Sequence, residues 1–486
     1  MCVGLLLAAK AGAQQTVPSS GTPAGGADDS RYSELEQQMQ TVMATLNDTR
    51  RQLHESEEKI DQLQSQLKLL QSQKSGESDA ASLQTAVADL KDETEILQSE
   101  VKQHEQSKVE SVSKFPVRLY GMVLFTTYAN DGVVDNQVVP ASAWPRTNGN
   151  TNNSFGASLS QTILGLKAYG PALWGAHSSG DVEMDFFNGA YGSPSPSAIY
   201  ARFRTGHFGL DWPNTSASVA VDTPLISPRN PTSYATVGEP ALSWSGNLWN
   251  WLPQFKVEQR LPTSATGHVG LEFGVIDPQY SLPGQPAGYT SQISARPGYE
   301  SRASYNWQRG DDVYGIGAGA YYSWSRYPYG QKIDSWAFTA DWNLPLQKWA
   351  LFSGELYHGS ALGDLGGGGF KDVIPLASDS DYALALGSEG GWSQLKLRGG
   401  QQFEGNLAIG QDTAYGNQVR QSALPVAGTI PYWNLARNRT IMENFIYKPR
   451  TYLLFSIEHR NLESWRAMAP SSNQAQVWTL SAGYLF

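Results

Sequence analysis

From Phe115 to the end of the chain, apolar and polar residues alternate with a period of two, in segments separated by turn-like breaks. This alternation is typical of β-strands that have one face in apolar and one in polar surroundings. The pattern predicts about sixteen strands, near residues 117–129, 156–170, 177–188, 198–212, 215–222, 253–261, 267–279, 295–307, 312–325, 332–342, 348–360, 388–398, 403–411, 437–447, 450–461 and 476–486.

The breaks between these strands alternate between short and long. The short ones include residues 213–214, 343–347 and 448–449, and the long ones include residues 130–155, 223–252, 361–387 and 412–436. Short turns at one rim and long loops at the other are the topology expected of a transmembrane β-barrel.

The last predicted strand strengthens this interpretation. One face of it carries Trp478, Leu480, Ala482, Tyr484 and Phe486, and the other carries Thr479, Ser481 and Gly483. An alternating strand that finishes on a phenylalanine is similar to the final strand and assembly signal of bacterial outer-membrane barrels. A soluble β-sandwich or propeller would also give many alternating strands, but it predicts neither this ending nor the alternation of short and long breaks.

The residues before the barrel follow a different period. Heptad a and d positions of one register are occupied by Leu35, Met39, Val42, Leu46, Leu53, Ile60, Leu63, Leu67 and Leu70. This pattern predicts an α-helical coiled coil over residues 31–108, interrupted near Gly76 and preceded by a flexible linker at 14–30. So narrow an apolar seam favours oligomerisation, with a tether to peptidoglycan as the alternative. Residues 1–13 resemble the end of a secretory signal peptide whose charged start is missing.

Composition agrees with an all-β transmembrane barrel that follows a coiled-coil extension. The chain contains 15 Trp, 23 Tyr and 48 Gly, and transmembrane barrels use aromatic side chains as girdles at both membrane interfaces. A net charge of -10 argues against nucleic acid as a partner. Barrels of sixteen strands leave an aqueous channel, and the small residues Gly315, Gly317 and Gly319 on one face favour an open pore.

Parity assigns many charged side chains to the lumen. Val182, Phe203, Phe255, Tyr305 and Ile457 define outward faces. The inward cations are then Arg202, Arg204, Lys256, Arg260, Arg302 and Arg460, and the inward carboxylates are Asp181, Glu183, Asp185, Glu258 and Glu300. Opposed rows of charge orient polar solutes, and Arg or Lys rings favour anions. The same residues would also serve as cross-strand ion pairs that brace the wall.

Several short runs resemble porins of the DcaP-like group. They are Arg202–Arg204, Leu210–Trp212, Val219–Pro224, Leu252–Lys256, Asn444–Pro449 and Glu458–Arg460. The resemblance implies a trimeric, sixteen-stranded porin with an amino-terminal coiled-coil extension that takes up small dicarboxylates. In general porins the third outer loop folds inward and sets the constriction. Here that loop is residues 223–251, and it offers Arg229 and Glu239 as constriction residues.

These observations predict an outer-membrane homotrimer for passive diffusion of small hydrophilic solutes, with its arm in the periplasm and no cofactor. A carbohydrate-selective porin and an envelope anchor that acts through the coiled coil are the alternatives. Catalysis is not expected, because the seven histidines are scattered and form no metal-ligand pair at helical spacing.

Overall fold

The computed structural model describes residues 116–146, 152–187, 201–280, 288–289, 295–327, 330–379, 382–422 and 434–486. Contacts divide the chain into two units, residues 1–112 and 113–486, and every described residue belongs to the second. The signal peptide (1–13), the linker (14–30) and the coiled coil (31–108) that the sequence predicts lie outside the described residues.

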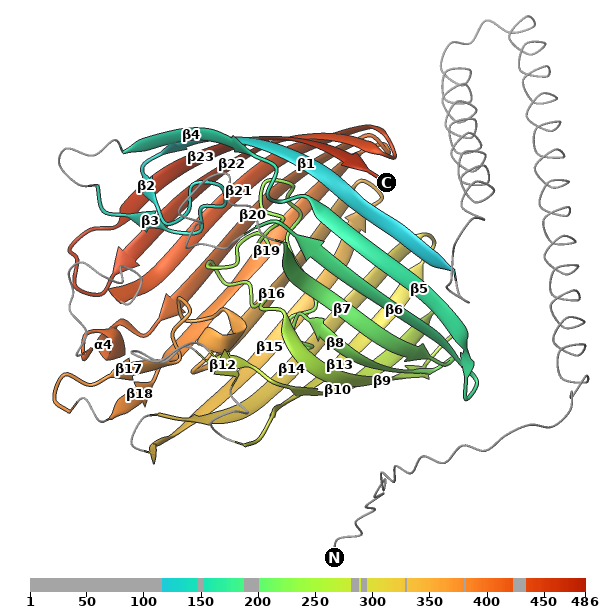
Figure 1. Ribbon diagram of the computed structural model, residues 1–486, viewed down its shortest axis with the longest axis horizontal. Helices are drawn as coiled ribbons and strands as arrows, with labels where there is room; N and C mark the ends of the chain where they lie inside the picture. The colour runs from blue at the N-terminus through green and yellow to red at the C-terminus, as the bar shows by residue number, and fades with distance from the viewer. Residues whose placement is uncertain are drawn as a thin grey trace, which may run out of the picture. The chain divides into compact units, whose positions relative to one another are not determined.

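The second unit is a barrel of antiparallel strands (Figure 1). Its strands are β1 (Val117–Asp131), β4 (Asn153–Ser158), β5 (Ile163–Leu173), β6 (Ala176–Asp185), β7 (Arg202–Asp211), β8 (Thr215–Asp222), β9 (Leu252–Pro262), β10 (Gly267–Ile276), β13 (Gly298–Arg309), β14 (Asp312–Arg326), β15 (Lys332–Gln347), β16 (Ala350–Ser360), β19 (Gly387–Gly399), β20 (Phe403–Ala414), β21 (Leu435–Arg450), β22 (Leu453–Arg466) and β23 (Asn473–Leu485).

The barrel is closed by the pairing of β1 with β23, where Val123 lies opposite Tyr484. On its other edge β1 pairs with both β4 and β5, so these two segments are one barrel strand in two pieces. The seventeen segments of the sheet among the described residues therefore make sixteen barrel strands. This confirms the predicted barrel of about sixteen antiparallel strands. The predicted strand at 156–170 differs in detail, because residues 159–162 interrupt it.

The two faces of the wall differ as the parity predicts. Large apolar side chains are exposed on the outside of many strands, including Phe125 on β1, Phe208 on β7, Phe273 on β10, Phe338 on β15 and Ile457 on β22. Side chains on the inner face are mostly buried and many are polar. An apolar outer belt around a polar interior is typical of a transmembrane barrel. No helix in the described part of the chain is long and apolar enough to span a membrane.

Turns at one rim of the barrel are short. Trp174 and Gly175, between β5 and β6, have φ values of 49° and 80°, as required by the tight hairpin turns that match the twist of two paired strands. Gly310 and Gly400 also have positive φ values, of 63° and 73°, in the turns after β13 and β19. We call this rim the inner rim and the opposite rim, which carries the long loops, the outer rim.

The long loops contain short elements of their own. They are β2 (Val133–Val134), β3 (Ala143–Trp144), β11 (Gln279–Tyr280), β12 (Gly288–Tyr289), the 3-10 helix η2 (Gly363–Leu365), β17 (Val373–Pro375), β18 (Ala383–Ala385) and α4 (Gly416–Val419). These elements occupy the outer end of the barrel, on the left of Figure 1.

Candidate functional site: the loop inside the barrel

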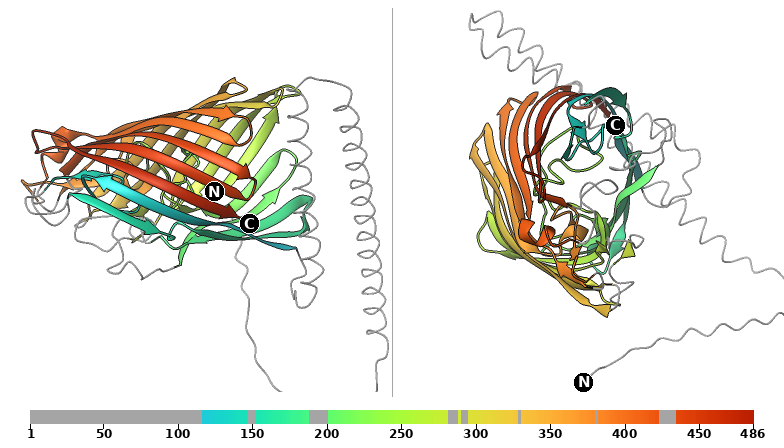
Figure 2. Two further views of the ribbon diagram at one scale, coloured as in Figure 1. Left: turned by 90° about the horizontal axis from the view of Figure 1, so that it is seen from above. Right: turned by 90° about the vertical axis from the view of Figure 1, so that its left-hand side faces the viewer.

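Residues 223–251, which join β8 to β9, form the inner loop. In the end-on view this green segment lies within the ring of strands (Figure 2). Its first turn is held by two carboxylates of the wall. The backbone N–H of Ile226 donates to Glu300 Oε2 over 3.3 Å, and the N–H of Arg229 donates to Glu355 Oε1 over 2.6 Å. Glu355 also accepts a hydrogen bond from the Ser227 hydroxyl.

The loop then continues along the inner face of the wall to β19, β22 and β23. Thr232 N donates to Gln394 Oε1 of β19 over 2.7 Å, and Ser233 Oγ donates to Glu458 Oε2 of β22 over 2.6 Å. Ser481 Oγ of β23 donates to the carbonyl of the next loop residue, Tyr234, over 3.0 Å. These wall residues lie in the interior of their strands, so the loop is held within the barrel and not at its rim.

Gln161 provides the next anchor. Its Oε1 accepts hydrogen bonds from the N–H groups of Val237 (2.6 Å) and Gly238 (2.8 Å), and its Nε2 donates to the carbonyl of Ala235 (2.9 Å). The side chain is buried and lies in the interruption between β4 and β5. The break in the predicted strand therefore places an amide that satisfies three backbone groups of the loop.

The returning arm of the loop packs against β19, β20 and β21. Ser245 Oγ and Thr440 Oγ1 are 2.8 Å apart, and Asn438 Nδ2 donates to the carbonyl of Trp244 over 2.9 Å. The wall approaches so closely that a Cβ at Gly410 would collide with the carbonyl oxygen of Ser245. Glycine in the wall here makes room for the loop backbone.

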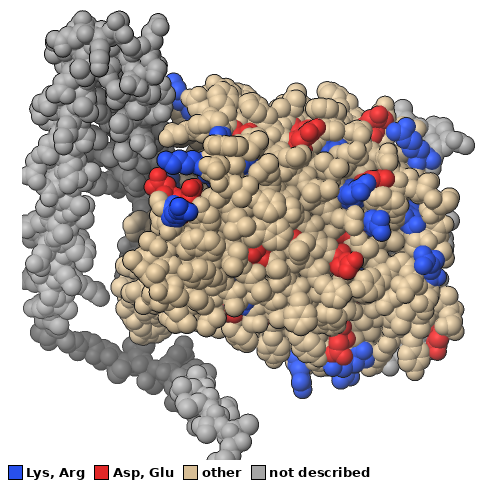
Figure 3. Space-filling model, turned by 180° about the vertical axis from the view of Figure 1, so that it is seen from behind, with Lys and Arg blue, Asp and Glu red and all other residues tan. Residues whose placement is uncertain are grey.

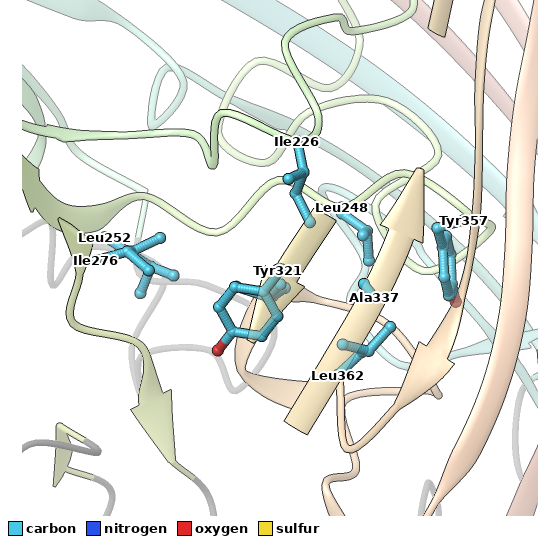
Figure 4. Close-up of a cluster of buried hydrophobic side chains, with 9 residues drawn as sticks. Ile226, Leu248, Leu252, Ile276, Tyr321, Ala337, Tyr357 and Leu362 are labelled. Atoms are coloured by element: carbon cyan, nitrogen blue, oxygen red, sulfur yellow. The ribbon is translucent and has the colours of Figure 1, made fainter. Parts of the chain in front are cut away.

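An apolar cluster joins the inner loop to the loop between β16 and β19. Figure 4 shows part of it. The cluster consists of Ile226, Leu248, Leu252, Ile276, Tyr321, Ala337, Tyr357, Leu362 and Leu365. Burial of several large apolar side chains stabilises this contact by about 1.5–3 kcal/mol for each side chain. The inner loop is thus held by packing as well as by hydrogen bonds.

Three glycines on the inner face of β14 accommodate this arrangement. A Cβ at Gly319 would meet Ile226 Cγ2 at 2.9 Å, one at Gly317 would meet Arg302 Nη2 at 2.6 Å, and one at Gly315 would meet Arg229 Nη2 at 3.1 Å. The sequence suggested that these glycines widen an open pore, but the space beside them is occupied by the inner loop and by two guanidinium groups.

Arg202 and Arg204 of β7 meet the end of the loop. Both contact Asp185, with Arg202 Nη2 at 2.7 Å and Arg204 Nη1 at 3.1 Å from Oδ2. Arg202 donates to the carbonyl of Gly238, and Arg204 donates to that of Val237. Side-chain exposure is 28% for Arg202 and 0% for Asp185. The carboxylate is covered while a guanidinium group remains accessible.

Asp341 of β15 organises a second cationic pair. Its Oδ1 accepts hydrogen bonds from Arg229 Nε (2.9 Å) and Arg302 Nη2 (3.0 Å), and its Oδ2 accepts one from Arg302 Nε (2.9 Å). Arg302 also contacts Glu272 of β10. The Arg229 side chain is 22% exposed and the Asp341 side chain 1%. Here too the cation keeps part of its surface exposed while the carboxylate is covered.

Asp181, Glu183 and Lys256, which were also predicted to line the lumen, each have a partner on another strand. His207 Nδ1 lies 2.8 Å from Asp181, and its Nε2 lies 3.1 Å from Asp222. Lys256 Nζ donates to Asp222 Oδ2 over 3.3 Å. Glu183 accepts a hydrogen bond from the Tyr120 hydroxyl over 3.1 Å.

The remaining predicted residues are separate from these sets. Arg260 Nη2 contacts Asp211 Oδ1 at 2.7 Å near the inner rim, with Glu258 at 3.9 Å from its Nη1. Arg460 is buried, with its Nε 3.3 Å from Glu458, and it donates to the carbonyl of Pro140 in the first loop. The predicted basic set is thus divided into several pairs and does not form one cluster.

Glu239 lies in the returning part of the inner loop and is buried. Burial, together with the nearby charge of Asp135 in the first loop, raises the pKa of the Glu239 carboxyl to about 7, against the attraction of Arg202. Burial likewise raises the pKa of Asp135 to about 6. The carboxyl groups of Glu239 in the inner loop and of Asp135 in the first loop therefore titrate near neutral pH.

Several residues that anchor the loop escaped the sequence analysis, among them Asp341, Glu355 and Gln161. Asp341 and Glu355 have inward parity on predicted strands, so the rule that identified Arg302 also applies to them. Gln161 has no such signal, because it acts from an interruption of the strand. Among the described residues, no group of three or more His, Cys, Asp or Glu side chains is arranged to hold a metal ion.

Neither a protein-family model nor a curated protein sequence matches the chain. Among solved structures, the chain is similar to the outer-membrane channel DcaP of Acinetobacter baumannii, with 17% identity, a TM-score of 0.58, and coverage of 78% of this chain and 99% of that chain. It also matches an anion-selective porin from Comamonas acidovorans, with 11% identity, a TM-score of 0.47, and coverage of 77% of this chain and 100% of that chain. The resemblance to DcaP-like porins is confirmed at the level of the fold.

Proposed function

We propose that this protein is an outer-membrane porin through which small hydrophilic solutes diffuse passively past the inner loop. The observation that carries the proposal is the attachment of residues 223–251 to the interior of a sixteen-stranded barrel. A barrel of this size is wide enough for an aqueous channel. A loop held against its inner wall narrows that channel to the size of small solutes, without a cofactor or an energy source.

The apolar outer face supports the membrane location. Exposed Phe125, Phe273 and Phe338 would cost free energy in water but not in lipid. The short turns would lie at the periplasmic side, as in bacterial barrels of this topology. The arm at residues 31–108 would then extend into the periplasm, where it would support a homotrimer and could reach peptidoglycan.

Within this function we propose a preference for anions, such as small dicarboxylates. Support comes from the pairs that hold the loop, because Asp185 and Asp341 are almost fully covered whereas Arg202 and Arg229 keep part of their surface exposed. Solutes passing these pairs meet guanidinium groups before carboxylates. Exposed Arg groups in a pore favour anions. Lys256 of the predicted pore-lining set, with 31% of its side chain exposed, would extend this field along the wall.

The test is single-channel conductance of the purified full chain in a planar bilayer, with reversal potential under a KCl gradient. We expect three equal conductance steps, one for each protomer of a trimer, a reversal potential that indicates preference for anions, and partial block by succinate. Block by maltose without block by succinate would favour a carbohydrate-selective pore. A barrel that inserts but does not conduct would contradict the porin proposal and leave the envelope anchor.

A further inference from the structure

His207 lies between two carboxylates in the wall of the barrel. Its Nδ1 is 2.8 Å from Asp181 on β6, and its Nε2 is 3.1 Å from Asp222 on β8. The same oxygen of Asp222, Oδ2, also accepts a hydrogen bond from Lys256 Nζ on β9 over 3.3 Å. The strands β6, β7, β8 and β9 are neighbours in the sheet (Figure 1). Acidic and basic side chains therefore alternate across four strands, and we call these four residues the charge row.

The charge row faces the channel. The exposed fraction of the side chain is 29% for His207, 19% for Asp181, 25% for Asp222 and 31% for Lys256. Phe208, the residue after His207, is exposed on the outer face, so parity places His207 on the lumen side. The outer surface visible in Figure 3 carries few charged residues between the two ends of the barrel. Solutes in the lumen, and not lipid, therefore meet these four side chains.

The geometry around the imidazole ring indicates that His207 carries a positive charge. Each ring nitrogen faces a carboxylate oxygen, and an ionised carboxylate only accepts hydrogen bonds. A neutral imidazole has one donor and one acceptor nitrogen, so it would direct a lone pair at one of the two carboxylates. The shared proton of each pair resides on the ring, because imidazole is a stronger base than a carboxylate. His207 is therefore a cation held between two anions.

Asp222 also forms the root of the inner loop. It is the last residue of β8, and its Oδ1 accepts a hydrogen bond over 2.8 Å from the N–H of Thr223, the first residue of the loop. Gln254 Nε2 on β9 donates to the carbonyls of both residues, over 2.9 Å and 2.8 Å. The charge row thus lies where the inner loop leaves the wall. A solute that passes the start of the loop comes close to His207.

We propose that His207 is a selectivity-determining residue of the pore, because its positive charge masks two carboxylates that would otherwise attract cations. With His207 protonated, the charge row holds two positive and two negative groups, which nearly cancel for an ion in the channel. Without this cation, one negative charge is left beside the inner loop. The next inward carboxylate of β6, Glu183, has Arg204 at 3.9 Å and does not alter this balance. This inference rests on the proposed porin function.

The experiment measures the reversal potential of the purified full chain in a planar bilayer under a KCl gradient at neutral pH. A unit charge about 7 Å from an ion in the channel changes the anion-to-cation permeability ratio about threefold at 0.1 M salt. We therefore expect this ratio to fall about threefold in His207→Gln. In His207→Lys, which keeps the charge, it should stay within about 1.5-fold of the unaltered chain. The matched control, His268→Gln at the inner-rim end of β10, leaves the charge row intact and should not change the ratio.

Removal of a carboxylate tests the same ion pair from its other side. Asp181→Asn should raise the ratio about threefold. His207→Gln/Asp181→Asn should return to within about 1.5-fold of the unaltered chain, because both charges of one pair are then absent. This rescue would not occur if His207 only supported the fold. If His207→Gln fails to assemble, Asp181→Asn and His207→Lys decide the question.

Three results would overturn the proposal. They are an unchanged ratio in His207→Gln, an equal fall in His207→Lys, and a double variant that retains the full loss. Because the measurement is a change in the ratio, an unaltered chain that conducts without preferring anions would contradict only the proposed anion preference. An unaltered chain that does not conduct would refute the porin function and the role of His207 with it.

Discussion

Replacement of Arg202 by glutamine tests whether the exposed cations beside the inner loop set ion selectivity. Arg202 is the more exposed of the two arginines on Asp185, with 28% of its side chain accessible against 11% for Arg204. In Arg202→Gln the buried Asp185 keeps Arg204 as a partner at 3.1 Å. The carboxylate therefore does not become an unpaired buried charge, and we expect the barrel to assemble normally.

The size of the effect follows from Coulomb interaction with a passing ion. A unit charge about 7 Å from an ion in water contributes roughly 0.6 kcal/mol, and screening at 0.1 M salt reduces this to about 0.3 kcal/mol. Because removal of the cation disfavours anions and favours cations by equal amounts, the permeability ratio changes by about 0.6 kcal/mol. We therefore expect the anion-to-cation permeability ratio to fall about threefold.

The assay is the reversal potential in a tenfold KCl gradient, measured at low and at high mean salt. The matched control is Arg309→Gln, which removes the same charge from an exposed residue at the inner rim. The shift should shrink to about 1.2-fold near 1 M salt, where the Debye length is about 3 Å. A reversal potential that is unchanged in Arg202→Gln, or that changes equally in the control, would refute the placement of Arg202 on the solute path.

Three further predictions test how the loops are held. Burial and the charge of Asp135 raise the pKa of the Glu239 carboxyl to about 7, above its ordinary value of 4.5. The protonated Glu239 side chain therefore contributes fully to loop stability below pH 4.5, and this contribution is lost as the pH rises through 7. Open-channel noise should therefore increase between pH 6 and 8, and the increase should be absent in Glu239→Gln; an equal increase in that variant would contradict the assignment. Lys371, whose pKa burial lowers, donates to the Leu435 carbonyl over 3.0 Å. Lys371→Met would leave the buried Asp412 without its cation. If this costs roughly 3 kcal/mol of local stability, proteolysis within residues 361–386 should become about a hundredfold faster. Lys348→Met, at an exposed turn, should have no effect. Gly410→Ala should displace the Ser245 carbonyl and raise channel noise, while Gly405→Ala, whose new Cβ would meet only the Asn444 carbonyl at 3.9 Å, should behave as the unaltered chain.

The strands could be predicted because a barrel wall imposes one rule at every position. Alternation of lipid-facing and interior side chains fixes the face of each residue, so the parity that placed Phe255 outside and Arg302 inside holds in the structure. The break at residues 159–162 departs from that rule, because Gln161 forms hydrogen bonds with the inner loop and not with the sheet. Parity describes the wall and carries no information about what the interior packs against.

The loop inside the barrel could be anticipated only in outline. Its length and its correspondence to the third outer loop of general porins indicated an inward fold, but its contacts depend on distances between strands far apart in the sequence. Arg229 reaches Asp341, which lies 112 positions away, and Ser233 reaches Glu458, which lies 225 positions away. No local pattern relates such pairs. The predicted pore-lining residues were therefore named one by one, without their partners.

Those partners determine which charged groups a solute in the pore can contact. A row of arginines and a row of carboxylates would, if equally exposed, cancel for a solute in the middle of the pore. In the structure Asp185, Asp341 and Glu355 are buried beneath the loop or the arginines. In the two pairs that hold the loop, Arg202 with Asp185 and Arg229 with Asp341, the cation is the more exposed member. Selectivity in this barrel should therefore follow the attachment of the inner loop, so that variants which detach the loop also lose the preference for anions.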